Sequence, residues 1–207
     1  MAKVHAFPQV DSSSCSASTS YMSSKPETFT VWMKSLLMQT NGCTVFNKNG
    51  EIVYRVDNYD KKAGSNEVYL MDLRGNVLFT ILRRKLFLFR QWRGYKSDGL
   101  KLKTQEPYFQ VKRCSEIFEG DLSCQITVRS GDAQESCYYK LEALSGKLAF
   151  KITNSNGEIV AEAQRKRSSK GVLLGDDVLT LVVEPHTDDH SFIMALVTVY
   201  GLMHHKL

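Results

Sequence analysis

The stretch TVFNKNGEIVYRV at residues 44–56 decides the fold, because related stretches recur twice more along the chain. A close copy is LAFKITNSNGEIVAEA at residues 148–163, and a looser copy is VYLMDLRGNVLFTIL at residues 68–82. Each copy consists of a run rich in strand-forming residues, a turn that contains glycine, and a second such run. Repetition of one hairpin predicts an antiparallel sheet built from copies of one unit.

Turn signals that contain glycine recur through the rest of the chain, with short segments rich in Val, Ile, Phe, Tyr and Thr between them. Many short strands with regular turns are typical of an all-β sandwich or barrel. Strands do not alternate with amphipathic helical patterns, so a parallel sheet is not expected. A chain of 207 residues with 43% hydrophobic residues is long enough for one sizeable core.

Alignment of the three copies on Gly50, Gly75 and Gly157 predicts which side chains form this core. Side chains alternate between the two faces of a strand, and one face of each second strand is apolar or aromatic throughout. These inward positions are Ile52, Tyr54, Val56, Val77, Phe79, Ile81, Ile159, Ala161 and Ala163. The two alanines of the third copy are small, which predicts room for a bulky element in the middle.

The apolar segment FIMALVTVYGLM at residues 192–203 is the candidate for that element. It is apolar nearly all round, which is typical of a helix buried on every side. The residues around it suit the helix dipole, with an aspartate as N-cap: Asp188 and Asp189 before it, and His204, His205 and Lys206 after it. A last core strand is the alternative, because Val197, Thr198 and Val199 are consecutive β-branched residues.

Two regions are expected along the chain. Residues 1–26 include a serine-rich segment that lacks the apolar residues needed to fold, and we expect a disordered tail there. Residues 27–207 should form a single domain. The five cysteines, an odd number with no CxxC pair, predict reduced thiols. No apolar run near the start resembles a signal peptide, so we expect a cytoplasmic protein, peripheral to a membrane or nuclear.

Several motifs together resemble the plant LURP-one-related family: FTVWMKSLL at 29–37, TVFNKNGEIVYRVDNY at 44–59, LMDLRG at 70–75 and FIMALV at 192–197. The likeness runs over about residues 27–207. It implies the fold of tubby C-terminal domains and phospholipid scramblases, a mainly β, 12-stranded antiparallel barrel around a hydrophobic C-terminal helix. It also implies a non-enzymatic module of plant signalling or defence, although such analogy identifies no site. Calcium binding is not carried over, because residues 184–190 lack the ligand spacing of a calcium loop.

Two basic triplets supply the candidate binding site. Arg83-Arg84-Lys85 begins eight positions after Gly75, and Arg165-Lys166-Arg167 begins eight positions after Gly157. Both triplets stand where a strand should leave the core, which places them near a rim of the barrel. Adjacent arginine and lysine suit multivalent phosphate, and the nearby Arg90, Arg93 and Lys170 would enlarge the patch. The predicted partner is a phosphoinositide headgroup or another anionic lipid surface.

The sequence also allows four other interpretations. Charges at strand ends are often simply solvated and protect sheet edges. Residues 165–167 also fit nuclear import or nucleic-acid contact, although nucleic acid is not the expected partner. A protein-interaction or transcription-regulatory scaffold with an unidentified protein partner is the alternative function. An apolar ligand inside the barrel is a further option if the helix does not fill it. A monomer is expected.

Catalysis and metal binding find little support in the sequence. His186 and His190 have the spacing of a helical metal pair, but Pro185 opposes a helix there and no HExxH pattern surrounds them. Asp189, His190 and Ser191 are the residue types of a catalytic triad, but sequence neighbours do not generally converge in space. Capping roles for Asp189 and Ser191 are expected instead. We therefore expect no enzyme activity, no cofactor and no metal.

Overall fold

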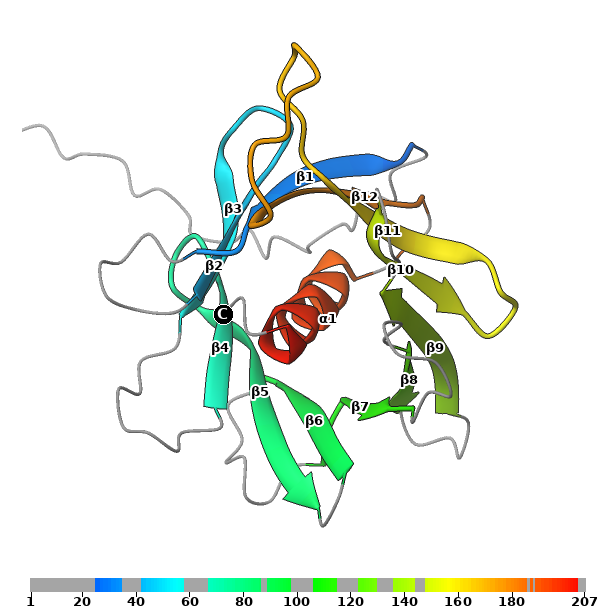
Figure 1. The fold of residues 1–207 in the computed structure, drawn as a ribbon. Coiled ribbons are helices and arrows are strands. Elements are labelled where there is room, and N and C mark those ends of the chain that lie inside the picture. The colour runs from blue at the N-terminus through cyan, green and yellow to red at the C-terminus, as the bar shows by residue number, and fades with distance from the viewer. Residues whose placement is uncertain are drawn as a thin grey trace, which may run out of the picture.

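The fold is a closed barrel of antiparallel strands that surrounds one helix (Figure 1). The computed structural model describes residues 25–34, 42–57, 67–86, 89–97, 106–114, 123–129, 136–143, 148–185, 187 and 189–204. The strands are β1 (Glu27–Trp32), β2 (Gly42–Phe46), β3 (Ile52–Asp57), β4 (Glu67–Asp72), β5 (Val77–Leu86), β6 (Phe89–Lys96), β7 (Phe109–Arg113), β8 (Ser123–Arg129), β9 (Ser136–Ala143), β10 (Leu148–Asn154), β11 (Ile159–Arg165) and β12 (Val178–Val183), followed by α1 (His190–Met203). The predicted 12-stranded barrel with a C-terminal helix is thus confirmed.

Each strand pairs with its neighbours in sequence, and β1 pairs with β12 to close the ring, from Glu27↔Val183 to Trp32↔Val178. In such a ring all odd-numbered strands run in one direction and all even-numbered strands run in the other. We call the end of the barrel where α1 begins the N-rim, and the end where α1 finishes the C-rim. Odd-numbered strands therefore end at the C-rim, and even-numbered strands end at the N-rim.

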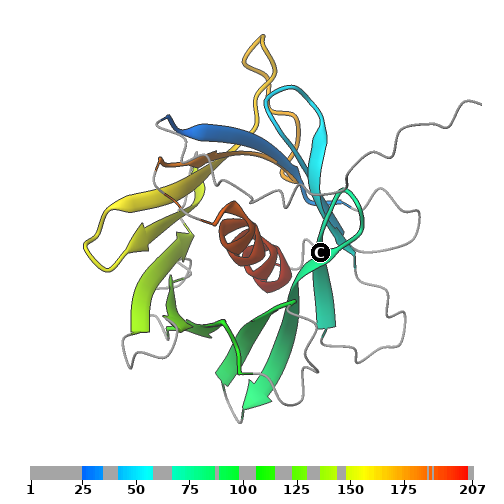
Figure 2. The ribbon, with the colours of Figure 1, turned by 180° about the vertical axis from the view of Figure 1, so that it is seen from behind.

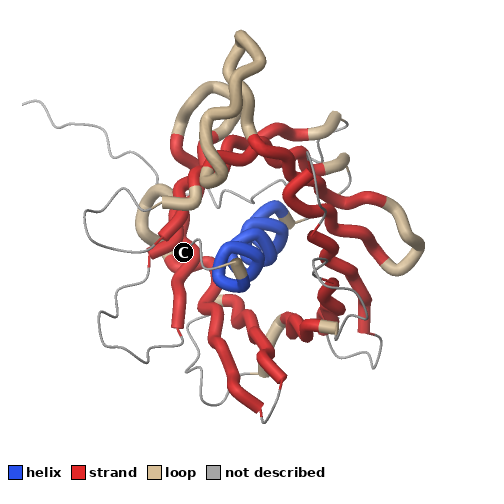
Figure 3. Tube along the Cα trace, viewed as in Figure 1, coloured by secondary structure: helices blue, strands red, loops and turns tan. Residues whose placement is uncertain are grey.

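Helix α1 runs through the middle of the ring, blue inside red in Figure 3. Every residue from Phe192 to Gly201 is buried, so the expected helix is confirmed and the alternative of a last strand is wrong. The Asp189 side chain caps its first turn by accepting a hydrogen bond from the Phe192 N–H at 3.1 Å. At the C-rim, Met203 Sδ lies 3.5 Å from Cys124 Sγ at the start of β8.

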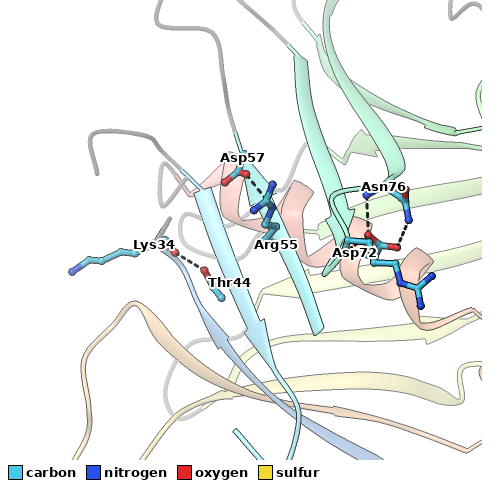
Figure 4. Close-up of polar contacts among 7 residues, drawn as sticks. Lys34, Thr44, Arg55, Asp57, Asp72 and Asn76 are labelled. Atoms are coloured by element: carbon cyan, nitrogen blue, oxygen red, sulfur yellow. Dashed lines mark hydrogen bonds and ion pairs between the residues drawn. The ribbon is translucent and has the colours of Figure 1, made fainter. Parts of the chain in front are cut away.

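The three related hairpins have the same turn, and all three turns lie at the N-rim. In each, the first side chain accepts hydrogen bonds from the N–H groups two and four residues later; the first residues are Asn47, Asp72 and Asn154. A side-chain hydrogen bond to the fifth residue closes the turn, shown in Figure 4 for Asp72 and Asn76. The glycine in fourth place has a φ of about +80°, a conformation that other residues rarely adopt. The repeat inferred from sequence therefore extends to individual hydrogen bonds.

The inward face predicted from the repeats is largely confirmed. Five of its positions are in the buried core: Val56, Phe79, Ile81, Ala161 and Ala163. Ile159, next to its turn, is instead 47% exposed at the N-rim, because the barrel opens there. The helix backbone comes closest to β5 and β4, on the wall opposite the two alanines.

The space beside the alanines is filled by side chains rather than by the helix backbone. The Tyr200 ring packs against Phe150, with ring centroids 4.4 Å apart and the planes tilted by 44°. Phe150 pairs across the strands with Ala163. The Tyr200 hydroxyl donates a hydrogen bond to the carbonyl of Ala149. These contacts place an aromatic ring beside the two alanines, in part of the space where an apolar ligand was considered, and that option stays a hypothesis.

The serine-rich segment at residues 11–24 and the residues His205 and Lys206 lie outside the described residues, so the predictions about them stay predictions. Among the described residues, no helix has both the length and the apolar character needed to cross a membrane. Cys43, Cys114 and Cys124 are free thiols, in agreement with the expected reduced state for these three.

Candidate functional site

The two basic triplets lie at the same end of the barrel. Both β5 and β11 are odd-numbered strands, so their final residues emerge at the C-rim. Five strands separate β5 from β11 in either direction round the ring, which puts the triplets on opposite walls. In Figure 1 the end of β5 is at the bottom and the β11–β12 connection is at the top, and Figure 2 shows the same separation from behind. The triplets therefore share a rim but do not form one patch.

The first triplet divides between the two faces of β5. Arg83 pairs across the strands with the buried Trp92, on the inward face, while the exposed Arg84 pairs with Gln91 on the outward face. The Nε atom of Arg83 and the Nε1 atom of Trp92 are buried without a hydrogen-bond partner in the described part of the chain. The side chain of Lys85 lies outside the described residues. Arg84 is thus the described cation of this triplet that is most accessible to an external anion.

Of the two neighbours expected to enlarge this patch, the side chain of Arg90 lies outside the described residues. Arg93 is half-buried, and its Nη2 atom lies 3.4 Å from Gln91 Oε1, whose amide nitrogen donates to Gln110 at 2.8 Å. Arg93 is therefore tied into a row of side chains on the outer wall.

Each cation of the second triplet already has a partner within the chain. Arg165 forms an ion pair with Asp176 at 3.0 Å, and both groups are largely exposed. Lys166 donates a hydrogen bond to the Thr30 hydroxyl, and Arg167 donates one to the carbonyl of Gly171 at 2.9 Å. These contacts hold the three basic side chains in place, and the negative charge of Asp176 partly cancels their positive charge.

The first related hairpin carries no triplet, and its corresponding residues 58–60 lie outside the described residues. Just before them, Arg55 Nε lies 3.3 Å from Asp57 Oδ2 (Figure 4), in an ion pair whose atoms are not aligned as a hydrogen bond. This strand end thus presents a balanced pair rather than a surplus of positive charge.

Beside the second triplet, the β11–β12 connection exposes three consecutive aliphatic side chains. Val172, Leu173 and Leu174 are 63%, 44% and 51% exposed, and the cation Lys170 lies at the turn just before them. The sequence interpretation missed this cluster, because a short aliphatic run next to glycine looks like part of a buried strand. The available signal was its position between two glycines and after four basic residues.

A pocket of about 570 Å³ lies at the opposite end, on the N-rim. Its lining combines aromatic rings with carboxylates: Tyr108, Tyr139 and Phe192, with Glu158, Glu184 and Asp189. The Phe192 ring meets Tyr139 edge-on at 5.4 Å between centroids, which connects the pocket floor to the first turn of α1. The sequence interpretation missed this pocket as well, because its lining comes from five separate parts of the chain.

Asp189 is the best-connected carboxylate of this pocket. Its Oδ2 atom lies 2.8 Å from Lys96 Nζ, and its Oδ1 atom accepts hydrogen bonds from Ser191 Oγ and the Phe192 N–H. Burial raises the pKa of Asp189, but the hydrogen bonds from Lys96 and Ser191 and the Lys96 charge outweigh burial, so the pKa lies below its ordinary value. The Lys96 ammonium also lies 4.6 Å from the centroid of the Tyr108 ring. Carboxylate and aromatic groups here already hold one cation.

These contacts assign Asp189 and Ser191 to helix capping, as expected, because the Ser191 hydroxyl donates to Asp189. The His190 ring instead packs edge-on against Phe29, at 5.8 Å. Within the described ranges, no group of three His, Cys, Asp or Glu side chains is placed to hold a metal ion. His186 lies outside those ranges.

Comparison with known proteins yields one consistent result. The family model described as LURP-one-related matches residues 27–201. Protein LURP-one-related 4 of Arabidopsis thaliana is 48% identical over 98% of this chain and 87% of its own length. Protein LURP-one-related 11 of the same plant is 42% identical over 98% of this chain and 89% of its own length.

Among solved structures, an X-ray structure of a protein from Arabidopsis thaliana has a TM-score of 0.61 and 14% sequence identity. The match covers 89% of this chain and 94% of the other. At this identity the likeness concerns the fold alone. It supports the barrel described above and carries no information about a ligand.

Proposed function

Since this chain belongs to the LURP-one-related family, a membership that specifies no activity, we propose from its own surface that it is a non-enzymatic module that binds anionic membrane lipids through the C-rim. The observation that carries this proposal is the emergence of two basic clusters at one rim of a closed barrel. A flat surface that approaches this rim meets both clusters at once. Two basic clusters at opposite ends of the barrel could not contact one flat surface together.

The spacing of the clusters decides between a surface and a single headgroup as the ligand. Twelve strands about 4.8 Å apart, tilted by about 40°, close into a ring roughly 24 Å across. Clusters on opposite walls are too far apart to grip one headgroup together. We therefore expect several phosphoinositides, the most highly charged lipids of a bilayer, to be bound at the same time. A single headgroup held in one pocket is not expected.

The charges set the expected strength of binding. A basic side chain near an anionic bilayer contributes about 1 kcal/mol, and this contribution weakens as salt rises. The ion pair of Arg165 with Asp176 reduces the contribution of the second triplet to membrane binding. The hydrogen bonds of Lys166 and Arg167 reduce it further. Binding should therefore be weak for neutral lipid, measurable for anionic lipid and strongly dependent on salt.

The direct test is co-sedimentation of the chain with vesicles of neutral phosphatidylcholine, vesicles with added phosphatidylserine, and vesicles with added phosphoinositide. Each is measured at low and at near-physiological salt. We expect binding in the order phosphoinositide, phosphatidylserine, neutral lipid, with a loss as salt rises. Absence of binding to every anionic vesicle at low salt, where surface charges act most strongly, would refute the proposal.

The N-rim pocket favours a second candidate, an interaction scaffold that accepts a basic side chain of a protein partner. Three carboxylates and three aromatic rings line the pocket, and both group types attract ammonium and guanidinium. Replacement of Glu184, whose carboxylate has no partner among the described contacts, is the matched test. E184Q should weaken binding of an arginine-rich peptide and leave vesicle binding unchanged. Equal peptide binding by the parent and E184Q would remove this candidate.

A further inference from the structure

The β11–β12 connection contains an unusual concentration of exposed apolar surface. Among the described residues, six large hydrophobic side chains are exposed, and three of them, Val172, Leu173 and Leu174, are consecutive. Single exposed hydrophobic residues are normal in a folded protein, whereas a contiguous exposed cluster marks a contact with a partner or a membrane. We call residues 166–175, which carry this cluster, the aliphatic hairpin.

The aliphatic hairpin has its own hydrogen bonds. The Ser168 N–H donates to the Val172 carbonyl at 2.7 Å, and the Gly171 N–H donates back to the Ser168 carbonyl at 2.8 Å. Nearer its base, the Leu174 N–H donates to the Lys166 carbonyl at 3.0 Å, and Arg167 and Leu173 form a β-bridge. The exposed aliphatic residues are therefore held in a defined hairpin and are not part of an irregular loop.

The hairpin projects from the barrel instead of folding back onto it. Successive side chains of an extended segment point in opposite directions, yet all three aliphatic residues are exposed. A segment that packed on the barrel would bury one of its faces. Figures 1 and 2 show the connection, in orange, reaching beyond the outline of the ring.

The base of the hairpin is anchored to the neighbouring strand end. Asp177 accepts a hydrogen bond from Trp32 Nε1 at 3.3 Å and pairs with Lys34 Nζ at 3.0 Å. Its carbonyl also accepts from the Met33 N–H at 2.8 Å. With base and turn both fixed, a contact at the tip requires little further ordering of the chain, which favours binding.

Four cations precede the aliphatic residues along the chain, Arg165, Lys166, Arg167 and Lys170, and the two carboxylates that follow, Asp176 and Asp177, each pair with a cation. Aliphatic side chains with basic residues beside them match the two layers of an anionic bilayer, in which phosphates lie directly above the start of the acyl chains. A soluble protein partner would need an apolar groove with acidic residues around it. An anionic lipid surface offers the same combination without any specific shape. The charge pattern therefore favours a membrane.

We propose that the aliphatic hairpin is a membrane-insertion element, which immerses Val172, Leu173 and Leu174 at the boundary of headgroups and acyl chains of an anionic bilayer. This inference rests on the proposed function and adds an apolar contact to its electrostatic one. The adjacent cations contact lipid phosphates while the aliphatic side chains leave water. Charge selects the membrane, and the hairpin extends the time the protein stays on it.

The test separates insertion from charge attraction. L173S/L174S removes apolar surface without changing charge, and L73S is the matched control, because Leu73 is 62% exposed in a turn at the N-rim. At physiological salt we expect L173S/L174S to bind phosphoinositide vesicles at least about tenfold more weakly than the parent, and L73S to bind like the parent. All substituted side chains are exposed, so circular dichroism and thermal melts should match the parent.

A second measurement reports immersion directly. The L173W variant, compared with the parent to subtract the two native tryptophans, is mixed with vesicles whose acyl chains are brominated. The added fluorescence should be quenched. Parent-like binding by L173S/L174S, or an unquenched added tryptophan on vesicles that do bind, would overturn insertion and leave the charge-based function standing. Failure of the parent to bind any anionic vesicle would overturn both.

Discussion

Replacement of Asp189 tests how the helix is held inside the barrel. The carboxylate caps α1 through the Phe192 N–H and pairs with Lys96. Loss of an N-cap costs about 1 kcal/mol, within roughly 0.5–2 kcal/mol. The ion pair adds at most about 1 kcal/mol, because the Lys96 side chain is 47% exposed and can turn to water. D189A should therefore lower the free energy of unfolding by about 2 kcal/mol in urea melts.

D189N is the matched control, since asparagine caps a helix about as well as aspartate but carries no charge. We expect it to lose only about 0.5–1 kcal/mol, mainly the ion pair. The order of stability is then parent, D189N, D189A. Equal destabilisation by the two substitutions would refute a contribution of the cap to stability.

The pH dependence supplies an independent check on the same residue. The pKa of Asp189 lies below its ordinary value in the folded protein, because the contacts with Lys96 and Ser191 outweigh the effect of burial. The carboxylate therefore stabilises the fold fully above its unfolded pKa of about 3.9, and this contribution is lost as pH falls through the lower folded value. The stability gap between the parent and D189A should be constant from about pH 7 to pH 5 and shrink below about pH 4. A gap that persists undiminished at pH 3 would contradict this account.

Three further predictions concern the core, the C-rim and a buried thiol. In G94A, the new methyl carbon would stand 2.0 Å from Cε1 of the fully buried Phe109 ring, so urea melts should show a loss of about 3 kcal/mol; a loss below about 1 kcal/mol would mean that the ring can move. D176N removes the carboxylate paired with Arg165 and should strengthen binding to anionic vesicles in co-sedimentation, whereas weaker binding would show that this pair positions the site. Burial raises the pKa of the Cys43 thiol to about 12, so C43S should leave the number of thiols that react in the native protein at pH 8 unchanged; a decrease by one would show that Cys43 is accessible.

The repeated hairpins and the helix were predictable because their signals are local. Glycine at Gly50, Gly75 and Gly157 sets each turn, and the alternation after it sets the inward face. The apolar run before Met203 is too long and too uniformly apolar for a strand. Such patterns need only neighbouring residues to be interpreted.

The arrangement of the candidate site was less predictable, because it depends on the whole ring. Sequence placed both triplets near a rim, but only the strand count shows that they lie on opposite walls. The exposure of Val172 and its neighbours follows from a short hairpin that extends beyond the sheet. Aliphatic residues in that position have the composition of a core strand, so propensity alone points to burial. The partners of Arg165 and Lys166 likewise come from distant segments.

The central claim is that the C-rim, and not positive charge in general, recognises the membrane. It is tested most directly by two charge reversals of equal size: R84E/R167E at the C-rim and K48E/R74E in exposed turns at the N-rim. Both variants change the net charge equally, and all four side chains are exposed. At near-physiological salt, R84E/R167E should lose binding to phosphoinositide vesicles while K48E/R74E binds nearly as the parent does. Equal losses by the two variants, or a greater loss by K48E/R74E, would contradict a binding surface at the C-rim.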